Sequence, residues 1–305
     1  MPARPGIYVE ILIRAEIDEV WRRTQQPELH EQWDLRFSRI QYLSRPDPAA
    51  PQRFMYATRI GGGLEIVGEG ESVGHIDGET GIRTSSLKFS SDLPYSLIRS
   101  GSGYWRYVPR AEGVTFLTWY DYDTRFGAIG RLADRLAFRQ LLGWATAWSF
   151  DRLRLWIEAG VTPAESLRQT FTHAVSRLTL AAVFFYHGLV PKLLTHDAAE
   201  LAMFADAGIS PERLALAVNL AGTGELALAA VLLFWWRSPW PLVVIFALMI
   251  AATMGVAIAS PRYLTGAFNP VTLNLAVAAL ALIDRGNVDG LPSARRCRRA
   301  PEGQS

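Results

Sequence analysis

Residues 240–259 read WPLVVIFALMIAATMGVAIA and contain no charged side chain. Twenty residues of helix rise about 30 Å, which matches the hydrocarbon thickness of a bilayer. The 24 residues between Arg237 and Arg262 carry no formal charge, and neither do the 21 residues between Arg262 and Asp284. Soluble domains rarely contain two such stretches in succession, so the sequence predicts an integral membrane protein.

The apolar region extends outward from this stretch into four segments of about 20 residues each. They are Val175–Leu194, Leu214–Trp236, Trp240–Ala259 and Tyr263–Ile283. Lipid offers the backbone no hydrogen-bond partners, so each segment should be a helix. Trp235, Trp236 and Trp240 gather at one boundary, where aromatic side chains favour the membrane interface. We therefore predict an all-α bundle of four transmembrane helices over residues 174–285.

The placement of Lys and Arg predicts the orientation of this bundle, because cytoplasmic loops are richer in these residues. The basic residues assigned to the cytoplasmic side are Arg168, Arg177, Arg237, Arg285 and the arginines of 295–299; those assigned to the outside are Lys192, Arg213 and Arg262. The N-terminal residues hold no apolar segment long enough for a secretory signal. We expect a multi-pass protein of the bacterial inner (cytoplasmic) membrane, with both termini in the cytoplasm.

Polar residues within lipid are costly and therefore informative. Glu225 is the one formal charge well inside the second segment, and Gly222 beside it would let another helix approach closely. Two interpretations stay open: a polar cluster that binds a headgroup, a quinone or a proton, or a protonated Glu225 that only fixes helix packing. Lys192 should extend to the outer interface.

Short motifs in this half resemble the DoxX-like membrane proteins. They are Arg177 with the run FFYHGLVPK at 184–192, the G-x-G-E-L run at 222–226, and FNP at 268–270. The resemblance covers about residues 173–285 and implies a four-helix membrane protein, with some relatives linked to thiosulfate:quinone oxidoreduction. It places His187, Lys192, Glu225 and Asn269 at the polar positions of the family. Paired cysteines are missing from the sequence, so thiol–disulfide chemistry is not supported.

The first half of the chain has an α+β pattern. Apolar side chains alternate from Ile7 to Ile13, as in a half-buried strand, and helices should follow over 15–21 and 29–33. Five further strands are predicted at Arg53–Ile60, Leu64–Ile76, Gly81–Phe89, Leu97–Val108 and Val114–Phe126. A helix over 128–159 closes the domain, with Leu132, Leu136, Leu141, Ala145, Trp148 and Leu155 as its apolar positions.

This order resembles the SRPBCC superfamily, which has the START/polyketide-cyclase helix-grip fold, over about residues 6–160. The resemblance is carried by the opening strand, the helix ending in Val20-Trp21, the segment Pro27–Trp33 and the terminal helix ending LRLWIE at 153–158. It implies an antiparallel sheet around a long helix and an elongated apolar cavity for a lipid, sterol or polyketide; a minority of members are cyclases or dehydratases. The aromatic candidates for the cavity lining are Trp33, Tyr56, Trp105, Trp119 and Tyr120, with plain core packing as the alternative.

Several classes of chemistry are excluded or unsupported. Nucleophile elbows, phosphate loops and metal-ligand spacings are missing from the sequence, and one cysteine excludes a disulfide framework. His75 could act as a general acid or base with Asp77 or Asp121, although a surface histidine is the commoner case. No basic face suits nucleic acid, no catalytic residue or metal site is identified, and no cofactor is evident, although a quinone is compatible with the intramembrane polar residues.

We therefore expect a helix-grip ligand-binding domain over 1–160, a linker over 161–173, a DoxX-like domain of four spans over 174–285 and a disordered basic tail over 286–305. The cytoplasmic domain would capture a hydrophobic small molecule (lipid, quinone or polyketide-like) beside the bilayer. The alternatives are a subunit of a quinone-linked membrane oxidoreductase, a cyclase-type enzyme, or a bundle that is only an anchor. The expected partners are the lipid bilayer and the small molecule, and there is room for a membrane-protein partner or a homo-oligomer.

Overall fold

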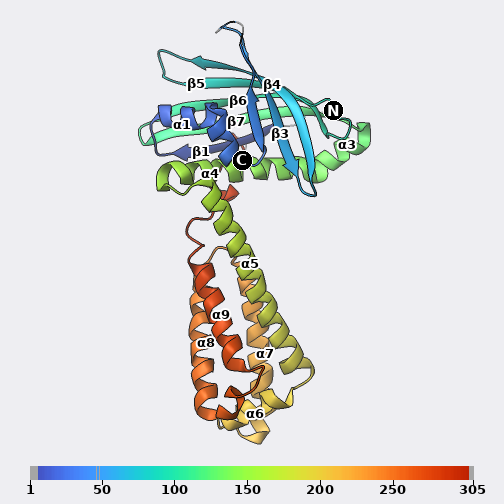
Figure 1. Cartoon of the computed structure of the whole chain (residues 1–305), viewed down its shortest axis with the longest axis vertical. Coiled ribbons are helices and arrows are strands. Elements are labelled where there is room, and N and C mark those ends of the chain that lie inside the picture. The colour runs from blue at the N-terminus through green and yellow to red at the C-terminus, as the bar shows by residue number, and fades with distance from the viewer. Residues whose placement is uncertain (1–5, 46, 48, 302–305) are drawn as a thin grey trace. The chain divides into compact units, whose positions relative to one another are not determined.

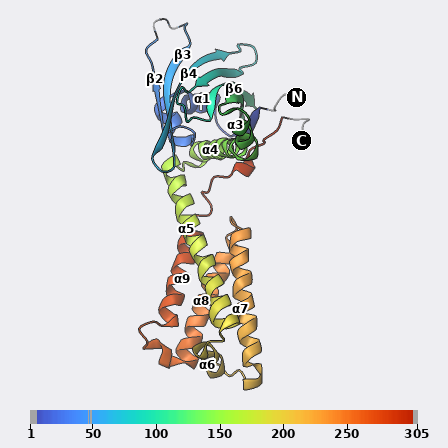
Figure 2. The ribbon, with the colours of Figure 1, turned by 90° about the vertical axis from the view of Figure 1, so that its right-hand side faces the viewer.

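The computed structural model describes residues 6–45, 47 and 49–301 (Figures 1 and 2). The chain separates into two compact units. The first extends to Ser166 and also includes the residues from Pro292 onward, and the second is Leu167–Leu291. Each unit has its own hydrophobic core.

The first unit is built on a seven-stranded antiparallel sheet with the order β1-β7-β6-β5-β4-β3-β2. The strands are β1 (Ile7–Ile13), β2 (Arg39–Tyr42), β3 (Gln52–Ile60), β4 (Leu64–Ile76), β5 (Arg83–Ser90), β6 (Ile98–Arg110) and β7 (Gly113–Thr124). The alternation read in β1 is confirmed, because Ile7, Val9, Ile11 and Ile13 are all buried. The sequence missed β2, which is only four residues long.

Helices cover one face of this sheet. They are α1 (Ile17–Gln25), α2 (Pro27–Trp33), α3 (Gly127–Ala133), the π-helical turn η1 (Asp134–Phe138) and α4 (Arg139–Ala159). Figure 1 shows α4 lying across the sheet, and Phe150 and Leu153 on this helix pack with Val9 and Phe116 in the core. The predicted helix-grip class is therefore confirmed by the topology of the unit.

The long closing helix differs from the predicted one in which face it buries. Trp148 and Leu155 are buried, but Leu132, Leu136 and Leu141 are 56%, 67% and 63% exposed. The turn η1 accounts for Leu132 and Leu136, because a π-helical turn accommodates one more residue than an α-helical turn and rotates the preceding residues relative to α4; Leu141 lies within α4 itself.

The second unit is entirely helical. Its elements are α5 (Pro163–His187, which begins in the first unit), η2 (Gly188–Leu194), α6 (Ala198–Asp206), α7 (Pro211–Phe234), α8 (Trp240–Ala259), η3 (Pro261–Leu264) and α9 (Pro270–Arg285). Among the described residues, three helical segments are long and apolar enough to cross a membrane: Pro163–Leu194, α7 and α8.

The predicted fourth span is shorter than expected. Helix α9 has 16 residues, or about 24 Å of rise, because Pro270 occupies its first turn and the Asn269 side chain accepts a hydrogen bond from the Thr272 N–H. Whether α9 crosses the bilayer therefore stays a prediction. The helical class of the second unit is confirmed.

The prediction of a disordered tail is wrong for the residues up to 301. Arg298 forms an antiparallel backbone bridge with Glu10 of β1, the Cys297 thiol donates to the Ala147 carbonyl at 3.2 Å, and the Ser293 N–H donates to the Asp151 carboxylate at 2.7 Å. Because β1 lies at the edge of the sheet, its free backbone groups can pair with the returning chain. The basic composition of the tail gave no sign of this pairing. Residues 302–305 lie outside the described chain.

Candidate ligand cavity and intramembrane polar cluster

A cavity of about 520 Å³ lies in the first unit between the inner face of the sheet and helix α4. Its walls are mainly apolar side chains, including Phe54, Ile66, Leu87, Phe89, Ile98 and Leu142. Among the residues that line it, Arg36 is the one permanently charged side chain. Cavities of about 300–1,000 Å³ with apolar walls and few polar groups are typical small-molecule sites.

Glycines in the central strands make room beside this cavity. A Cβ atom added at Gly70 of β4 would collide with the Phe54 ring, and one added at Gly101 of β6 would collide with the Phe89 ring. The two rings therefore lie over the glycine backbones. Any larger residue at Gly70 or Gly101 would push these rings into the cavity.

Three of the five predicted lining residues reach the cavity. They are Tyr56, whose hydroxyl donates to the Ser90 carbonyl at 3.2 Å; Trp105; and Tyr120, whose hydroxyl lies 2.8 Å from that of Thr146. Trp33 is fully buried behind Trp105, as in the core-packing alternative. Ligand binding by these residues stays a prediction.

Trp119 lies on the opposite, outer face of the sheet, where it stacks on Tyr104 with ring centroids 6.2 Å apart. Neighbouring residues of a strand point to opposite faces, so Trp119 and Tyr120 could not both line one cavity. This alternation was readable in the sequence.

A charged cluster that the sequence did not predict forms one end of the cavity. The Asp34 carboxylate accepts hydrogen bonds from Arg36 Nε at 2.9 Å and Arg36 Nη2 at 2.6 Å, and lies 3.1 Å from His30 Nε2. Burial raises the pKa of the Asp34 carboxyl, but the attraction and hydrogen bonds of Arg36 and His30 outweigh burial and hold this pKa well below its usual range. Burial lowers the pKa of His30, although Asp34 opposes the effect. At neutral pH the cluster is therefore an ion pair beside a neutral imidazole.

The Arg36 guanidinium gives this end of the cavity a specific chemistry. Its carbon lies 5.5 Å from the centroid of the Tyr120 ring, and both groups line the cavity. The bonds to Asp34 use two of the five guanidinium N–H groups and a side-chain hydrogen bond to Tyr120 uses another, so further N–H groups can donate to a ligand oxygen. The available signal in the sequence was the group His30, Asp34 and Arg36 beside the aromatic candidate Trp33.

The structure gives the proposed acid–base residues other partners. His75 lies exposed near the end of β4, while the Asp77 carboxylate accepts a hydrogen bond from the Thr80 hydroxyl at 2.8 Å. The Asp121 carboxylate accepts from Arg139 at 2.8 Å. A general acid or base role for His75 therefore stays a prediction.

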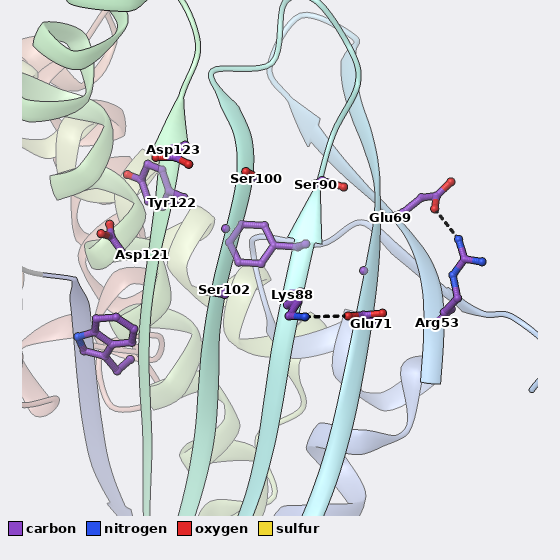
Figure 3. A pocket seen from close by; sticks show the side chains of 14 residues that line it. Arg53, Glu69, Glu71, Lys88, Ser90, Ser100, Ser102, Asp121, Tyr122 and Asp123 are labelled. Atoms are coloured by element: carbon purple, nitrogen blue, oxygen red, sulfur yellow. Dashed lines mark hydrogen bonds and ion pairs between the residues drawn. The ribbon is translucent and has the colours of Figure 1, made fainter. Parts of the chain in front are cut away.

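A second, more open hollow of about 710 Å³ lies on the outer face of the sheet (Figure 3). Its carboxylates are matched by basic side chains: Glu69 by Arg53, Glu71 by Lys88, Asp121 by Arg139 and Asp123 by Arg99. Most of these groups are exposed, so each pair stabilises little and solvent competes for any ligand. The inner cavity is therefore the better candidate site, although the outer hollow is larger.

In the second unit, Lys192 is buried between two carboxylates. Its Nζ lies 3.3 Å from Glu200 Oε1 and 3.2 Å from Glu225 Oε1. The prediction that Lys192 extends to the interface is therefore wrong, because its side chain is 8% exposed and paired inward. Gly188 and Gly222 bring η2 and α7 into backbone contact there, as expected for Gly222.

The other two predicted polar residues are not part of the described ion pairs. Asn269 is half-buried at the start of α9, and the His187 ring packs edge-on against Tyr186 with centroids 5.6 Å apart. Within the described chain, Glu225 Oε2 is buried and lacks a hydrogen-bond partner. Of the predicted residues, Lys192 and Glu225 form an ion pair, with Glu200 added from α6, and a binding role for the predicted site stays a prediction.

A buried ion pair that the sequence also missed joins three parts of the bundle. Asp284 of α9 lies 2.5 Å from His173 Nδ1 and accepts from Arg177 Nε at 3.1 Å. The other guanidinium nitrogens of Arg177 donate to the carbonyls of Trp235 at 3.3 Å and Ser238 at 2.7 Å. The sequence had assigned Arg177 to the cytoplasmic side and to a DoxX-like motif, but not to an ion pair.

Comparison with known proteins supports the predicted DoxX-like resemblance. The family described as DoxX-like matches residues 181–282. The uncharacterized membrane protein YndG of Bacillus subtilis (strain 168) is 50% identical over 183 residues, which cover 60% of this chain and 68% of that protein.

Two solved structures resemble the first half. The di-domain ARO/CYC StfQ from the steffimycin biosynthetic pathway has 16% identity and a TM-score of 0.41, over 51% of this chain and 50% of that one. The STAR-related lipid transfer protein (fragment 25–204) from Xanthomonas axonopodis has 18% identity and a TM-score of 0.37, over 48% and 82%. Similarity at this level does not carry a ligand from those proteins to this one.

Proposed function

This chain belongs to the family of the Bacillus subtilis membrane protein YndG and contains a DoxX-like region, and on that premise we propose that its helix-grip unit binds a hydrophobic small molecule bearing a polar oxygen. The observation that carries the proposal is the cavity of about 520 Å³, whose apolar walls end at Arg36. An apolar ligand body would displace water from the walls, while its oxygen would accept a hydrogen bond from the guanidinium.

The charge of this cluster limits the ligand further. Arg36 is already neutralised by Asp34 through two hydrogen bonds, so the site has no net charge to attract a free anion. The remaining N–H groups of Arg36 suit a carbonyl, a phenol or an ester oxygen better than a multiply charged headgroup. The proposed ligand class is therefore lipid-, quinone- or polyketide-like.

The bundle would hold this cavity at the membrane. We assign it four spans with both termini in the cytoplasm, because the Lys and Arg residues are more numerous on that side. A short connection supports this arrangement, since only residues 160–162 separate α4 from α5, the helix that continues into the bundle. The ligand would thus be bound beside the cytoplasmic leaflet.

The test is native mass spectrometry of the full chain released from detergent, followed by identification of the small molecules released on unfolding. We expect wild type to retain an apolar adduct. Ala145→Phe, which places a ring in the cavity, should lose it, whereas the matched outer-face variant Ser102→Phe should retain it. Equal adduct levels in both variants would disprove a cavity ligand.

A second candidate is a subunit of a quinone-linked membrane oxidoreductase, favoured by the unpartnered, buried Oε2 atom of Glu225. A hydroxyl of a reduced quinone could donate to this atom. Under this function, decylubiquinol should bind the full chain and Glu225→Gln should weaken binding, while the adduct of the helix-grip cavity remains. If Ala145→Phe weakens the binding of decylubiquinol and Glu225→Gln does not, the quinol binds in the helix-grip cavity.

A further inference from the structure

The segment that leads into α4 exposes an apolar surface. Phe126, Ile129, Leu132 and Leu136 are 53%, 79%, 56% and 67% exposed. We call these four residues, with the exposed Arg131 and Arg135 between them, the lip. Soluble surfaces rarely expose several large apolar side chains on consecutive helical turns without a partner.

The exposed charge of the lip is entirely positive. The one acidic residue in its sequence, Asp134, is fully buried. Its carboxylate accepts a hydrogen bond from the Tyr122 hydroxyl at 2.6 Å and pairs with Arg139 at 3.1 Å. Arg131 and Arg135 therefore meet solvent without a neighbouring carboxylate from this segment.

The lip is continuous with the opening of the cavity. Leu141, one turn beyond η1, both lines the cavity and is 63% exposed. Ile60, Leu64 and Tyr95 also line the cavity and are between 45% and 49% exposed. These four side chains form an apolar rim through which the cavity meets the surface.

A lipid surface is the partner that fits this chemistry. Helical segments with Phe, Leu and Ile on one side and Arg beside them lie in the interface of anionic bilayers. The chain is a membrane protein, and the short connection to α5 keeps the lip within reach of lipid, so even weak contacts would be occupied. A soluble protein partner would gain no such advantage.

We propose that the lip docks on the anionic surface of the membrane, so that the rim of the cavity opens onto lipid. An apolar ligand would then pass between bilayer and cavity without crossing water. The transfer of a ligand between bilayer and cavity rests on the proposed ligand function, whereas the docking of the lip on the membrane does not.

The test uses the full chain in nanodiscs of phosphatidylcholine, alone or mixed with phosphatidylglycerol. Leu136→Cys carries a fluorophore, and Val73→Cys, 51% exposed on the opposite face of the sheet, is the matched control. Cys297 is buried and its thiol should not be labelled. Headgroup spin-labelled lipid should quench the Leu136 label strongly in anionic discs, and the Val73 label little.

Charge reversal provides the second measurement. Arg131→Glu with Arg135→Glu should reduce quenching of the Leu136 label to the Val73 level, since both side chains are exposed and the fold should be retained. Docking is disproved if the Leu136 and Val73 labels are quenched equally, or if quenching of the Leu136 label is the same without phosphatidylglycerol. It is also disproved if the Leu136 label is shielded from water but not quenched by the spin-labelled lipid, because that result would indicate a protein partner. If the Leu136 label is quenched but mass spectrometry finds no adduct, the docking of the lip is supported and the proposed ligand function is rejected.

Discussion

The two units bury the same set of charges in different surroundings. In the first, Asp34 pairs with Arg36 and His30; in the second, Asp284 pairs with Arg177 and His173. Each carboxylate is fully buried and accepts from one guanidinium and lies beside one imidazole.

The difference lies in what the arginine faces. Arg177 donates also to the carbonyls of Trp235 and Ser238, so its guanidinium is held by protein on all sides. Arg36 forms part of a cavity wall. Burial of an ion pair therefore does not identify a functional site: the Asp284 cluster joins helices, and the Asp34 cluster leaves a donor for a ligand.

The largest effect should come from breaking the enclosed pair. Arg177→Ala leaves Asp284 as a buried charge without its main partner, which should destabilise the bundle by about 3–5 kcal/mol. The measurement is thermal unfolding of the full chain in detergent. Arg285→Ala, which removes the exposed pair with Asp289, is the control and should change stability by about 1 kcal/mol or less. Similar losses in both variants would contradict the structural role of Arg177.

The cavity pair should respond differently. Arg36→Met removes the donor and leaves Asp34 uncompensated, whereas Asp34→Asn with Arg36→Met removes the uncompensated charge. Both variants should lose the bound adduct by about tenfold or more, equivalent to about 1.4 kcal/mol, but the double variant should be the more stable. Mass spectrometry and thermal unfolding of the same samples separate the two effects. Retention of the adduct by the double variant would show that Arg36 does not contact the ligand.

Local patterns in the sequence predicted most of the elements, and the DoxX-like resemblance singled out Lys192 and Glu225, but nothing predicted the Asp284 cluster of the bundle. The alternation in β1 and the charge-free length of α8 are visible within one segment. The partners of Asp284, in contrast, lie 107 and 111 residues earlier in the chain, and nothing local indicates that they meet. Lys192 was misread for the same reason, because Glu200 and Glu225 surround it only after η2 and α7 come into contact.

The cavity was partly predictable. Periodicity placed Tyr120 and would have excluded Trp119, but it could not separate Trp105 on the wall from Trp33 in the core, since both are apolar-facing aromatics. The tail was not predictable from composition, because its order depends on a strand edge almost three hundred residues away.

As the pH is lowered, the Asp34 cluster should be disturbed before the apolar walls of the cavity. Both pKa values are lowered on folding, so stability from His30 is lost as pH falls below about 6.5 and that from Asp34 as pH falls below about 4. Each group contributes at most about 1.4 kcal/mol per pH unit. Thermal unfolding of the helix-grip unit within the full chain, followed by pH, should show both losses. Asp34→Asn should remove the loss of stability that occurs below about pH 4. If the variant and wild type show the same dependence of stability on pH, the charges assigned to the cluster are wrong.

The smallest effect concerns another buried carboxylate, Asp151, which holds the tail. It accepts from the Ser293 N–H at 2.7 Å and from Arg154 at 2.7 Å. Asp151→Asn retains an acceptor but loses the charge, so it should weaken this contact by about 1 kcal/mol. Burial raises the pKa of the Cys297 thiol to about 12, so alkylation of this thiol reports opening of the tail. Alkylation should become several-fold faster, by about the factor that 1 kcal/mol allows, while adduct and bundle stability stay unchanged. If the rate does not change, the tail is held by its pairing with β1 alone, and the charge of Asp151 serves its ion pair with Arg154 and not the tail.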